Sequence, residues 1–308
     1  MKKSIFAVVI PVIVCAAAAT QDFRKTGDYF GQKKSGSSAE PFAPGIVTAQ
    51  YNNHGSVTFS PDGKEAYWAV LDYGKEKQRA VLESRNENGR WTLPRLAFFS
   101  RPGFVDDVPF ISPDGGKLFF TSWRPLTQGG KTDKENIWVM EKSGAGWSAP
   151  KPLPQAINRL EDIHHQVSVD GRGNLYFGAN PKGGQGNPDI YCSMFKDGEF
   201  QKPFPLGPII NTPAIETTPF IAPDGSYLIF CRFHPAGWSM FISYREKNDG
   251  WTQPLELRGV ILPPRAMNIG APQVTRDGKF LFFIGSFDGK HRMFWAEASF
   301  IEDLRPKK

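Results

Sequence analysis

One short turn recurs five times along this chain of 308 residues, and it constrains the fold more than any other feature. The turn has the form Ser-Pro-Asp-Gly or a shortened version of it, and its aspartates, at intervals of about fifty residues, are Asp62, Asp114, Asp170, Asp224 and Asp277. Proline presets φ at the first central position of such a turn, and glycine takes the left-handed position. A unit repeated at this interval predicts an all-β repeat architecture such as a β-propeller.

Strand-like runs flank every turn. Runs at 57–59, 109–111, 166–168 and 219–221 precede it, and continuously apolar runs at 66–68, 118–120, 175–177, 228–230 and 281–283 follow it. A third run lies at 80–82, 137–139, 190–192, 240–242 and 293–295, and proline-bearing segments such as 149–153 and 202–206 come next. Continuous apolar runs predict strands buried on both faces, whereas proline restricts a strand to an outer edge.

The last repeat has no fourth strand after residues 293–295, and residues 40–47 resemble the fourth strands of the other repeats. We therefore predict a five-bladed β-propeller of four-stranded antiparallel blades over residues 40–300, with the ring closed by the N-terminal strand. A six-bladed ring is the alternative, although no sequence is left over to build it.

The Ser-Pro-Asp-Gly-Lys turns are followed by an aromatic-rich strand and then by Asn136-Ile137-Trp138 or Asp189-Ile190-Tyr191. This pattern resembles the WD-like β-propeller repeat of TolB-type proteins over about residues 40 to 299. The resemblance implies a propeller and, by analogy with TolB itself, a periplasmic platform for protein interactions. The third and fifth turns depart from the pattern because they lack the proline.

The N-terminal residues have the three parts of a secretory signal peptide. Lys2 and Lys3 are followed by an apolar run at 5–14 and by small residues at 16–19. We predict a signal peptide over 1–19, a linker over 20–39 and a C-terminal tail over 301–308, in a periplasmic or secreted protein. Lipidation at Cys15 is the alternative, but the preceding Val14 is larger than such a site requires.

The remaining composition bears on partners. The net charge of +6 is spread along the chain, which favours a solvated surface over nucleic-acid binding. No later run is apolar and long enough to span a membrane, and we expect a monomer. Cys192 and Cys231 lie in strand-like runs of different repeats, which predicts buried free thiols; a disulfide is the alternative.

Topology narrows the search for a site, because the Asp-Gly turns all lie on one face and the other loops surround the opposite mouth of the channel. At equal distances before the turn aspartates lie His54, Asp106, Asp162, Glu216 and Ile269. The full set of candidate ligand-binding residues at this mouth is His54, Asp106, Asp107, Asp162, His164, His165, Glu216, Arg124, Asn180, Arg232 and His234. Convergent polar groups in a concavity are typical of binding sites.

These observations favour a non-catalytic binding or scaffold module for a protein or an envelope glycan. No Gly-x-Ser-x-Gly elbow, Walker loop or dinucleotide fingerprint occurs, and we expect no cofactor and assign no catalytic residue. The alternative is a carbohydrate-active enzyme, a glycoside hydrolase or lyase, using Asp106, Asp162 and Glu216. Polar residues that only bind water or cap strands are a third interpretation, and residues 170–174 resemble a calcium loop too weakly to predict a metal.

Overall fold

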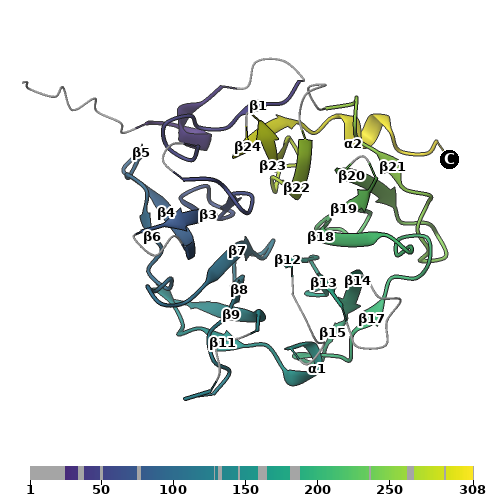
Figure 1. Ribbon diagram of the computed structural model, residues 1–308, viewed down its shortest axis with the longest axis horizontal. Coiled ribbons are helices and arrows are strands. Elements are labelled where there is room, and N and C mark those ends of the chain that lie inside the picture. The colour runs from purple at the N-terminus through teal and green to yellow at the C-terminus, as the bar shows by residue number, and fades with distance from the viewer. Residues whose placement is uncertain are drawn as a thin grey trace, which may run out of the picture.

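Five antiparallel sheets form a ring around a central axis in the computed structural model (Figure 1). The structure describes residues 25–33, 38–48, 51–74, 78–127, 129–130, 134–144, 146–158, 165–180, 188–235, 237–261, 267–287 and 289–307. The five-bladed propeller predicted from the sequence is therefore confirmed, and the six-bladed alternative is not adopted.

Each blade contributes four strands from the axis outward. Blade 1 contains β2 (Thr58–Phe59), β3 (Glu65–Tyr73), β4 (Gln78–Glu87) and β6 (Arg95–Leu96). Blade 2 contains β7 (Asp106–Ile111), β8 (Lys117–Ser122), β9 (Asn136–Ser143) and β11 (Lys151–Pro152). Blade 3 contains β12 (His165–Val169), β13 (Leu175–Ala179), β14 (Asp189–Ser193) and β17 (Phe204–Pro205). Blade 4 contains β18 (Ile215–Ile221), β19 (Tyr227–His234), β20 (Gly237–Tyr244) and β21 (Leu255–Glu256).

Blade 5 closes the ring with strands from both ends of the chain. It contains β22 (Met267–Val274), β23 (Phe280–Phe287), β24 (Lys290–Glu297) and β1 (Glu40–Pro41). In its register Glu40 faces Trp295 and Pro41 faces Phe294, and the indole Nε1 of Trp295 donates to Glu40 Oε1 at 3.1 Å. The N-terminal strand thus covers the outer edge of the last blade, as predicted.

Short elements complete the chain. They are the 3-10 helix η1 (Asp28–Gly31), the helices α1 (Gln155–Asn158) and α2 (Phe300–Asp303), and the short strands β5 (Arg90–Trp91), β10 (Gly146–Trp147), β15 (Phe195–Lys196) and β16 (Glu199–Phe200). None of the helices in the described ranges is long and apolar enough to cross a membrane.

The described part of the segment predicted as a linker packs onto the joint between the first and last blades. Phe30 lies 4.4 Å from Trp91 between ring centroids, and the indole of Trp91 donates to the Gly27 carbonyl at 2.8 Å. On the other side of the joint, Tyr29 meets Phe280 edge-on at 5.3 Å. Residues 27–30 therefore contact both blades that the closing strand joins.

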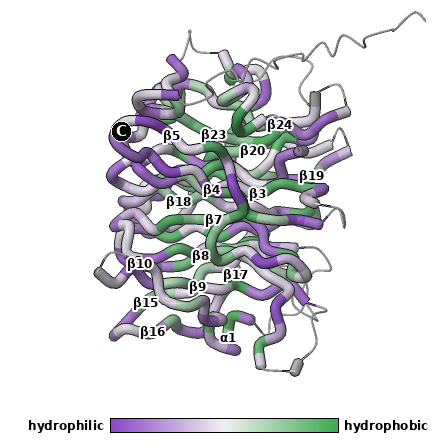
Figure 2. The backbone as a smooth tube through the Cα atoms, turned by 90° about the vertical axis from the view of Figure 1, so that its left-hand side faces the viewer, coloured by the Kyte–Doolittle hydropathy of each residue, from purple (hydrophilic) through white to green (hydrophobic). Residues whose placement is uncertain are grey.

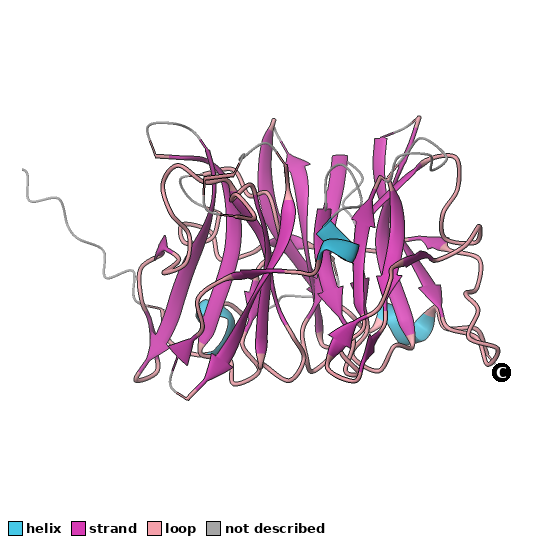
Figure 3. Cartoon of the chain, turned by 90° about the horizontal axis from the view of Figure 1, so that it is seen from below, coloured by secondary structure: helices cyan, strands magenta, loops and turns pink. Residues whose placement is uncertain are grey.

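The middle strands are buried on both faces, as their continuous apolar sequences predict. In β8 the residues from Leu118 to Ser122 are all buried, and in β13 every residue is buried. Figure 2 shows the hydrophobic stretches along the stacked strands and the hydrophilic ones toward the loops. Figure 3 shows the strands running between two loop-bearing faces of the ring.

The aspartate of each turn stabilises its own turn. In the second turn Ser112 donates to Asp114 Oδ1 at 2.5 Å, and the same oxygen accepts the backbone N–H of Gly116 at 2.9 Å. The turn at Asp170 works in the same way, since Asp170 accepts the backbone N–H groups of Arg172 and Asn174 at 2.9 and 3.0 Å. The carboxylate oxygens are therefore used within the turn.

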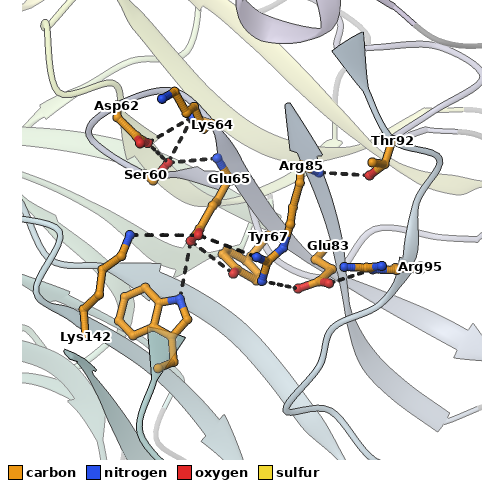
Figure 4. A network of polar contacts seen from close by, with 11 residues as sticks. Ser60, Asp62, Lys64, Glu65, Tyr67, Glu83, Arg85, Thr92, Arg95 and Lys142 are labelled. Carbon is orange, nitrogen blue, oxygen red and sulfur yellow. Dashed lines mark hydrogen bonds and ion pairs between the residues drawn. The ribbon is translucent and has the colours of Figure 1, made fainter. Parts of the chain in front are cut away.

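A polar network joins blades 1 and 2 beside the first Asp-Gly turn (Figure 4). Glu65 of β3 accepts from the hydroxyl of Tyr67 at 3.2 Å and from the indole of Trp147, on β10, at 3.4 Å. Lys142 of β9 and Arg85 of β4 lie within 4.0 Å of the same carboxylate. These contacts join blade 1 to blade 2, so we interpret the network as structural.

Both cysteines of the described residues are buried free thiols, as predicted. Burial raises the pKa of Cys192 and of Cys231 to about 12, so both remain protonated at neutral pH.

Candidate functional site

A cavity of about 360 Å³ opens at the mouth of the channel opposite the Asp-Gly turns. Its wall includes residues from every blade: His54, Asp107, Val108, Glu135, Gln166, Thr217, Thr218, Cys231, Phe233, Trp238, Asn268, Ile269, Gly270, Ala271, Ile284 and His291. A concavity of this size with a mainly apolar wall and a few convergent polar groups has the properties of a small-molecule or side-chain binding site. We call it the mouth cavity.

An ion-paired corner occupies one side of the mouth cavity. His54 Nδ1 lies 2.6 Å from Asp107 Oδ2, and Arg79 Nη1 donates to the same oxygen at 2.7 Å. Because the His54 and Arg79 charges outweigh the cost of burial, the pKa of Asp107 lies below its usual range. The negative charge of Asp107 in turn raises the pKa of His54.

Glu135 belongs to the same corner, but its pKa is shifted in the opposite direction from that of Asp107. Its Oε1 accepts from the hydroxyl of Thr121 at 2.8 Å and lies 3.6 Å from Arg79 Nη1. Burial, followed by the charge of Asp107, raises the pKa of Glu135 to about 7. Two neighbouring carboxyls with pKa values displaced in opposite directions form a pair of the kind that often marks functional sites.

Aromatic and aliphatic side chains form the opposite wall. The rings of Phe233 and Trp238, on paired positions of β19 and β20, lie 5.3 Å apart between centroids. Phe233 remains 43% exposed, although it is a large apolar side chain. Ile269 and Ile284 of blade 5 are buried and continue this wall.

Two glutamines cross the middle of the channel. The amide Nε2 of Gln166, in blade 3, donates to the Pro272 carbonyl of blade 5 at 2.8 Å. Gln273 of blade 5 donates to the Pro109 carbonyl of blade 2 at 3.3 Å. These hydrogen bonds join blades that are not neighbours in the ring, and they form a floor beneath the mouth cavity.

The inner strands are irregular where they reach the mouth. Val108, Thr218 and Ala271 stand at equivalent distances before their turn aspartates and have φ values of 38°, 48° and 54°. The strand pairing shifts register at the same places in blades 2, 4 and 5. Such bulges redirect side chains at the rims of β-structures and often lie next to binding sites.

Two acidic residues expected at the mouth lie outside the cavity wall. Asp106 is fully buried, bonded to Arg124 at 2.8 Å and to the Ser122 hydroxyl at 2.7 Å. Glu216 is also fully buried, and Arg232 donates to it at 2.7 Å. Both carboxylates therefore stabilise the ends of their own blades, because each has an arginine as its counter-charge: Arg232 on β19, and Arg124 two residues after the end of β8.

The other predicted residues are placed as follows. His54 and Asp107 line the cavity, Asn180 lies half-buried after β13, and His234 Nε2 lies 2.9 Å from the Ser239 hydroxyl on the outer side of blade 4. Asp162 and His164 lie outside the described residues, and only the backbone of His165 is described, in β12 opposite Gly178.

The sequence did not single out Glu135, Gln166, Phe233 and Trp238 as site residues. Glu135 immediately precedes the Asn136-Ile137-Trp138 strand, which is the third strand of its blade. Its place in the loop before that strand could have indicated that it lies on the face with the site. Phe233 and Trp238 lie at the two ends of the loop that joins the second and third strands of blade 4, on the face where the site was expected.

A second cavity, of about 470 Å³, lies at the turn-bearing mouth on the other side of the two glutamines. Tyr29, Phe59, Phe110, Phe220 and Phe282 contribute to its wall, together with residues of the Pro-Asp-Gly turns. Its turn aspartates, Asp62 and Asp277, are used within their turns, and the described residues provide no cluster of His, Cys, Asp or Glu suited to a metal ion. The mouth cavity, though smaller, contains the ion-paired His54 and Asp107 together with the carboxyl of Glu135.

No model of a known protein family matches the sequence, and no curated protein matches it either. Several solved structures have a fold similar to that of this chain. TolB from Acinetobacter baumannii is 18% identical at a TM-score of 0.48, over 79% of this chain and 54% of that one. The putative TolB from Agrobacterium tumefaciens is 15% identical at a TM-score of 0.50, over 80% and 77% of the two chains. A luciferin-regenerating enzyme is 10% identical at a TM-score of 0.49, over 86% and 96%.

These likenesses bear on the fold alone. The chain spans about half the length of the Acinetobacter TolB structure, and the Agrobacterium structure supports the same propeller architecture. The resemblance to TolB-type propellers is thus confirmed for the fold, while function is argued from the site.

Proposed function

We propose that this chain is an exported, non-catalytic β-propeller that binds a partner protein or an envelope glycan in the mouth cavity. The observation that carries the proposal is the cavity itself, with an aromatic pair on one wall and an ion-paired corner on the other. Apolar walls supply affinity, and a few fixed polar groups supply orientation. The basic, apolar and small-residue order of residues 1–19 supports export to the periplasm or the medium.

Two features support binding over catalysis. Asp106 and Glu216, two of the three carboxylates expected to serve a glycoside-cleaving enzyme, are buried in ion pairs with arginines, and the third, Asp162, lies outside the described residues. The remaining pair is held by Arg79, since both Asp107 and Glu135 lie within 3.6 Å of its Nη1. Groups engaged in this way orient a ligand more readily than they exchange protons with it.

A carbohydrate-active enzyme is the second candidate, and one observation favours it. Glu135, whose pKa rises to about 7, stands beside Asp107, whose pKa is lowered. A carboxyl with a raised pKa and one with a lowered pKa are the acid and base pair used in acid-assisted cleavage of a glycosidic bond, where the two flank that bond.

The test uses the mature protein immobilised and exposed to envelope extract, beside the variants Trp238→Ala and Phe204→Ala. Phe204 is an exposed aromatic residue on the outer strand of blade 3, so it serves as the matched control. Binding in the mouth cavity predicts that only Trp238→Ala loses the retained partner. Release of reducing sugar ends from envelope polysaccharide, abolished by Glu135→Gln, would instead establish the enzyme. Retention by Trp238→Ala equal to that of the unaltered protein would contradict the proposed site.

A further inference from the structure

Charge at the mouth is layered, with the carboxylates beneath and the basic groups above. The side chains of Asp107 and Glu135 are 1% and 5% exposed, whereas those of His54 and Arg79 are 31% and 24% exposed. The flanking pairs follow the same order, because each arginine is more exposed than the carboxylate it covers. A molecule that approaches this face therefore meets N–H donors and positive charge, which suits a carboxylate.

The cavity wall also contains buried polar atoms without a partner. Gln166 is 1% exposed and uses its Nε2 on the Pro272 carbonyl, while its Oε1 has no hydrogen-bond partner in the described part of the chain. The hydroxyl of Thr217, which is 5% exposed, also lacks a partner among the described residues. Unsatisfied buried polar groups are rare in native proteins. An amide oxygen accepts only, so Gln166 requires a ligand that donates from a hydroxyl or an amine.

The aromatic pair adds a third requirement. Phe233 and Trp238 present ring surface to the same cavity, and Phe233 is exposed enough to contact a ligand. Flat apolar ring surface stabilises ligands that have an apolar face of their own. A ligand that satisfies all three features combines a carboxylate, at least two hydrogen-bond donors and an apolar face in a volume of about 360 Å³.

We infer that the mouth cavity binds a carboxylate-bearing sugar, the acidic unit of a glycan, with its carboxylate toward His54 of the wall and the adjacent Arg79, which contacts the same Asp107 oxygen. This inference rests on the proposed function, because it names the ligand class of the same site. Its hydroxyls donate to Gln166 Oε1 and to Thr217, and its ring lies against Trp238. An aspartate-rich peptide supplies the carboxylate and N–H donors but no ring with an apolar face to lie against Trp238, so the aromatic pair favours the sugar.

The experiment is titration calorimetry on the mature protein with three probes. They are a glucuronate-containing disaccharide, the neutral disaccharide with glucose in place of glucuronate, and a short aspartate-rich peptide. We expect the acidic disaccharide to bind at least tenfold more tightly than the neutral one, and the peptide to bind more weakly than the acidic sugar. His54→Gln should remove most of that tenfold difference. Arg305→Gln removes a cation from an exposed ion pair near the C-terminus and should alter neither affinity.

The outcomes separate this inference from the proposed function. Equal affinity for the two disaccharides would contradict recognition of the carboxylate, but the cavity would still be a glycan-binding site. Tight binding of the peptide alone would show that the ligand is a peptide and not a sugar, and the protein would still be a binding module. If no probe binds while the unaltered protein retains an envelope partner that Trp238→Ala loses, the ligand class is wrong and the site stands. If Trp238→Ala also keeps that partner, the acidic-sugar ligand and the mouth cavity as binding site are both wrong.

Discussion

The side-chain amide of Gln166 in the third blade donates a 2.8 Å hydrogen bond to the Pro272 carbonyl in the fifth blade, across the centre of the ring. Blades of a propeller ordinarily contact only their neighbours, so a bond across the axis couples parts of the ring that packing leaves independent. Gln273 makes the second such contact, to the Pro109 carbonyl of blade 2. Together these glutamines divide the channel into the two cavities.

We predict that Gln166→Ala lowers the free energy of unfolding by about 1–2 kcal/mol, because a buried carbonyl at Pro272 loses its donor. Urea unfolding followed by tryptophan fluorescence measures the change. Gln201→Ala is the control, since Gln201 is exposed and its amide makes only a long contact of 3.4 Å. A variant at Gln166 as stable as the control would show that the crossing bond contributes nothing.

Glu216 and Arg232 form an ion pair, and we predict that replacing either residue alone lowers the stability of the fold substantially. Glu216→Gln should destabilise the fold by about 3–5 kcal/mol, because it leaves the Arg232 side chain, only 17% exposed, without its counter-charge. Changing both residues to methionine should recover much of that loss. Glu302→Gln, at an exposed pair with Arg305, should cost less than about 1 kcal/mol. Thermal unfolding of the four proteins measures the cycle, and equal costs at the two sites would contradict the buried pairing.

Glu135 predicts a dependence of stability on pH. Its pKa is about 7 in the folded protein, against an ordinary value of 4.5 for a glutamate exposed to water. A carboxyl whose pKa is raised by folding binds its proton more tightly in the folded state, so its contribution is complete below pH 4.5 and is lost as the pH rises to about 7. The loss corresponds to a free energy on the order of 3 kcal/mol.

His54 acts in the same direction, because its raised pKa adds stability below pH 6.5 that disappears as the pH rises through the folded value. The lowered pKa of Asp107 gives stability above pH 3.8 and does not contribute within this window. The measurement is the melting temperature between pH 4.5 and 7.5 for the unaltered protein and for Glu135→Gln. We expect a fall with rising pH that is markedly smaller in the variant, and two parallel curves would contradict the assignment to Glu135.

The fold was predictable because every blade repeats one local pattern. The turn aspartates, the continuous apolar runs and the proline-bearing outer strands each follow from residue chemistry, and residues 40–47 completed the count by their likeness to the other outer strands. The segment around Phe30 was not predictable in this way. Its packing on Trp91 and Phe42 depends on contacts between parts of the chain that no repeat relates.

The site was predictable as a face and only partly as a set of residues. Equivalent repeat positions brought Asp106 and Glu216 to the correct end of their strands, but spacing alone does not reveal which way a strand turns. Asp106 and Asp107 are consecutive in a regularly paired part of β7, so they point to opposite faces: Asp107 lines the cavity while Asp106 faces Arg124. The contacts of Gln166 are likewise decided by the closed ring and not by neighbours in the sequence.

Export predicts a shortened mature protein. The order of Lys2 and Lys3, the apolar run at 5–14 and the alanines at 16–19 places the cleavage between Ala16 and Gln21. N-terminal sequencing or intact-mass measurement of the protein recovered from its native compartment checks this. A mature chain that begins at Met1 would contradict export, and a lipid-modified mass that begins at Cys15 would establish the lipoprotein alternative.

Closure of the ring by the N-terminal strand predicts the most severe effect. Phe42, fully buried next to β1, packs on Phe282 at 4.7 Å and on Trp295 at 5.2 Å between ring centroids. Phe42→Ala should therefore cost about 3–5 kcal/mol. Deletion of residues 41–48 should cost more, because it also removes Val47 from the core and exposes the edge of β24.

Phe204→Ala provides the matched comparison, since Phe204 also lies on an outer strand but is 46% exposed. Its effect should stay below about 1 kcal/mol in thermal and urea unfolding, because surface substitutions of this kind change stability little. Light scattering on the deletion variant should also reveal association, because an uncovered strand edge offers unpaired backbone groups to other chains. A monomeric deletion variant with unchanged unfolding would mean that blade 5 is complete without the N-terminal strand, which the pairing of Glu40 with Trp295 contradicts.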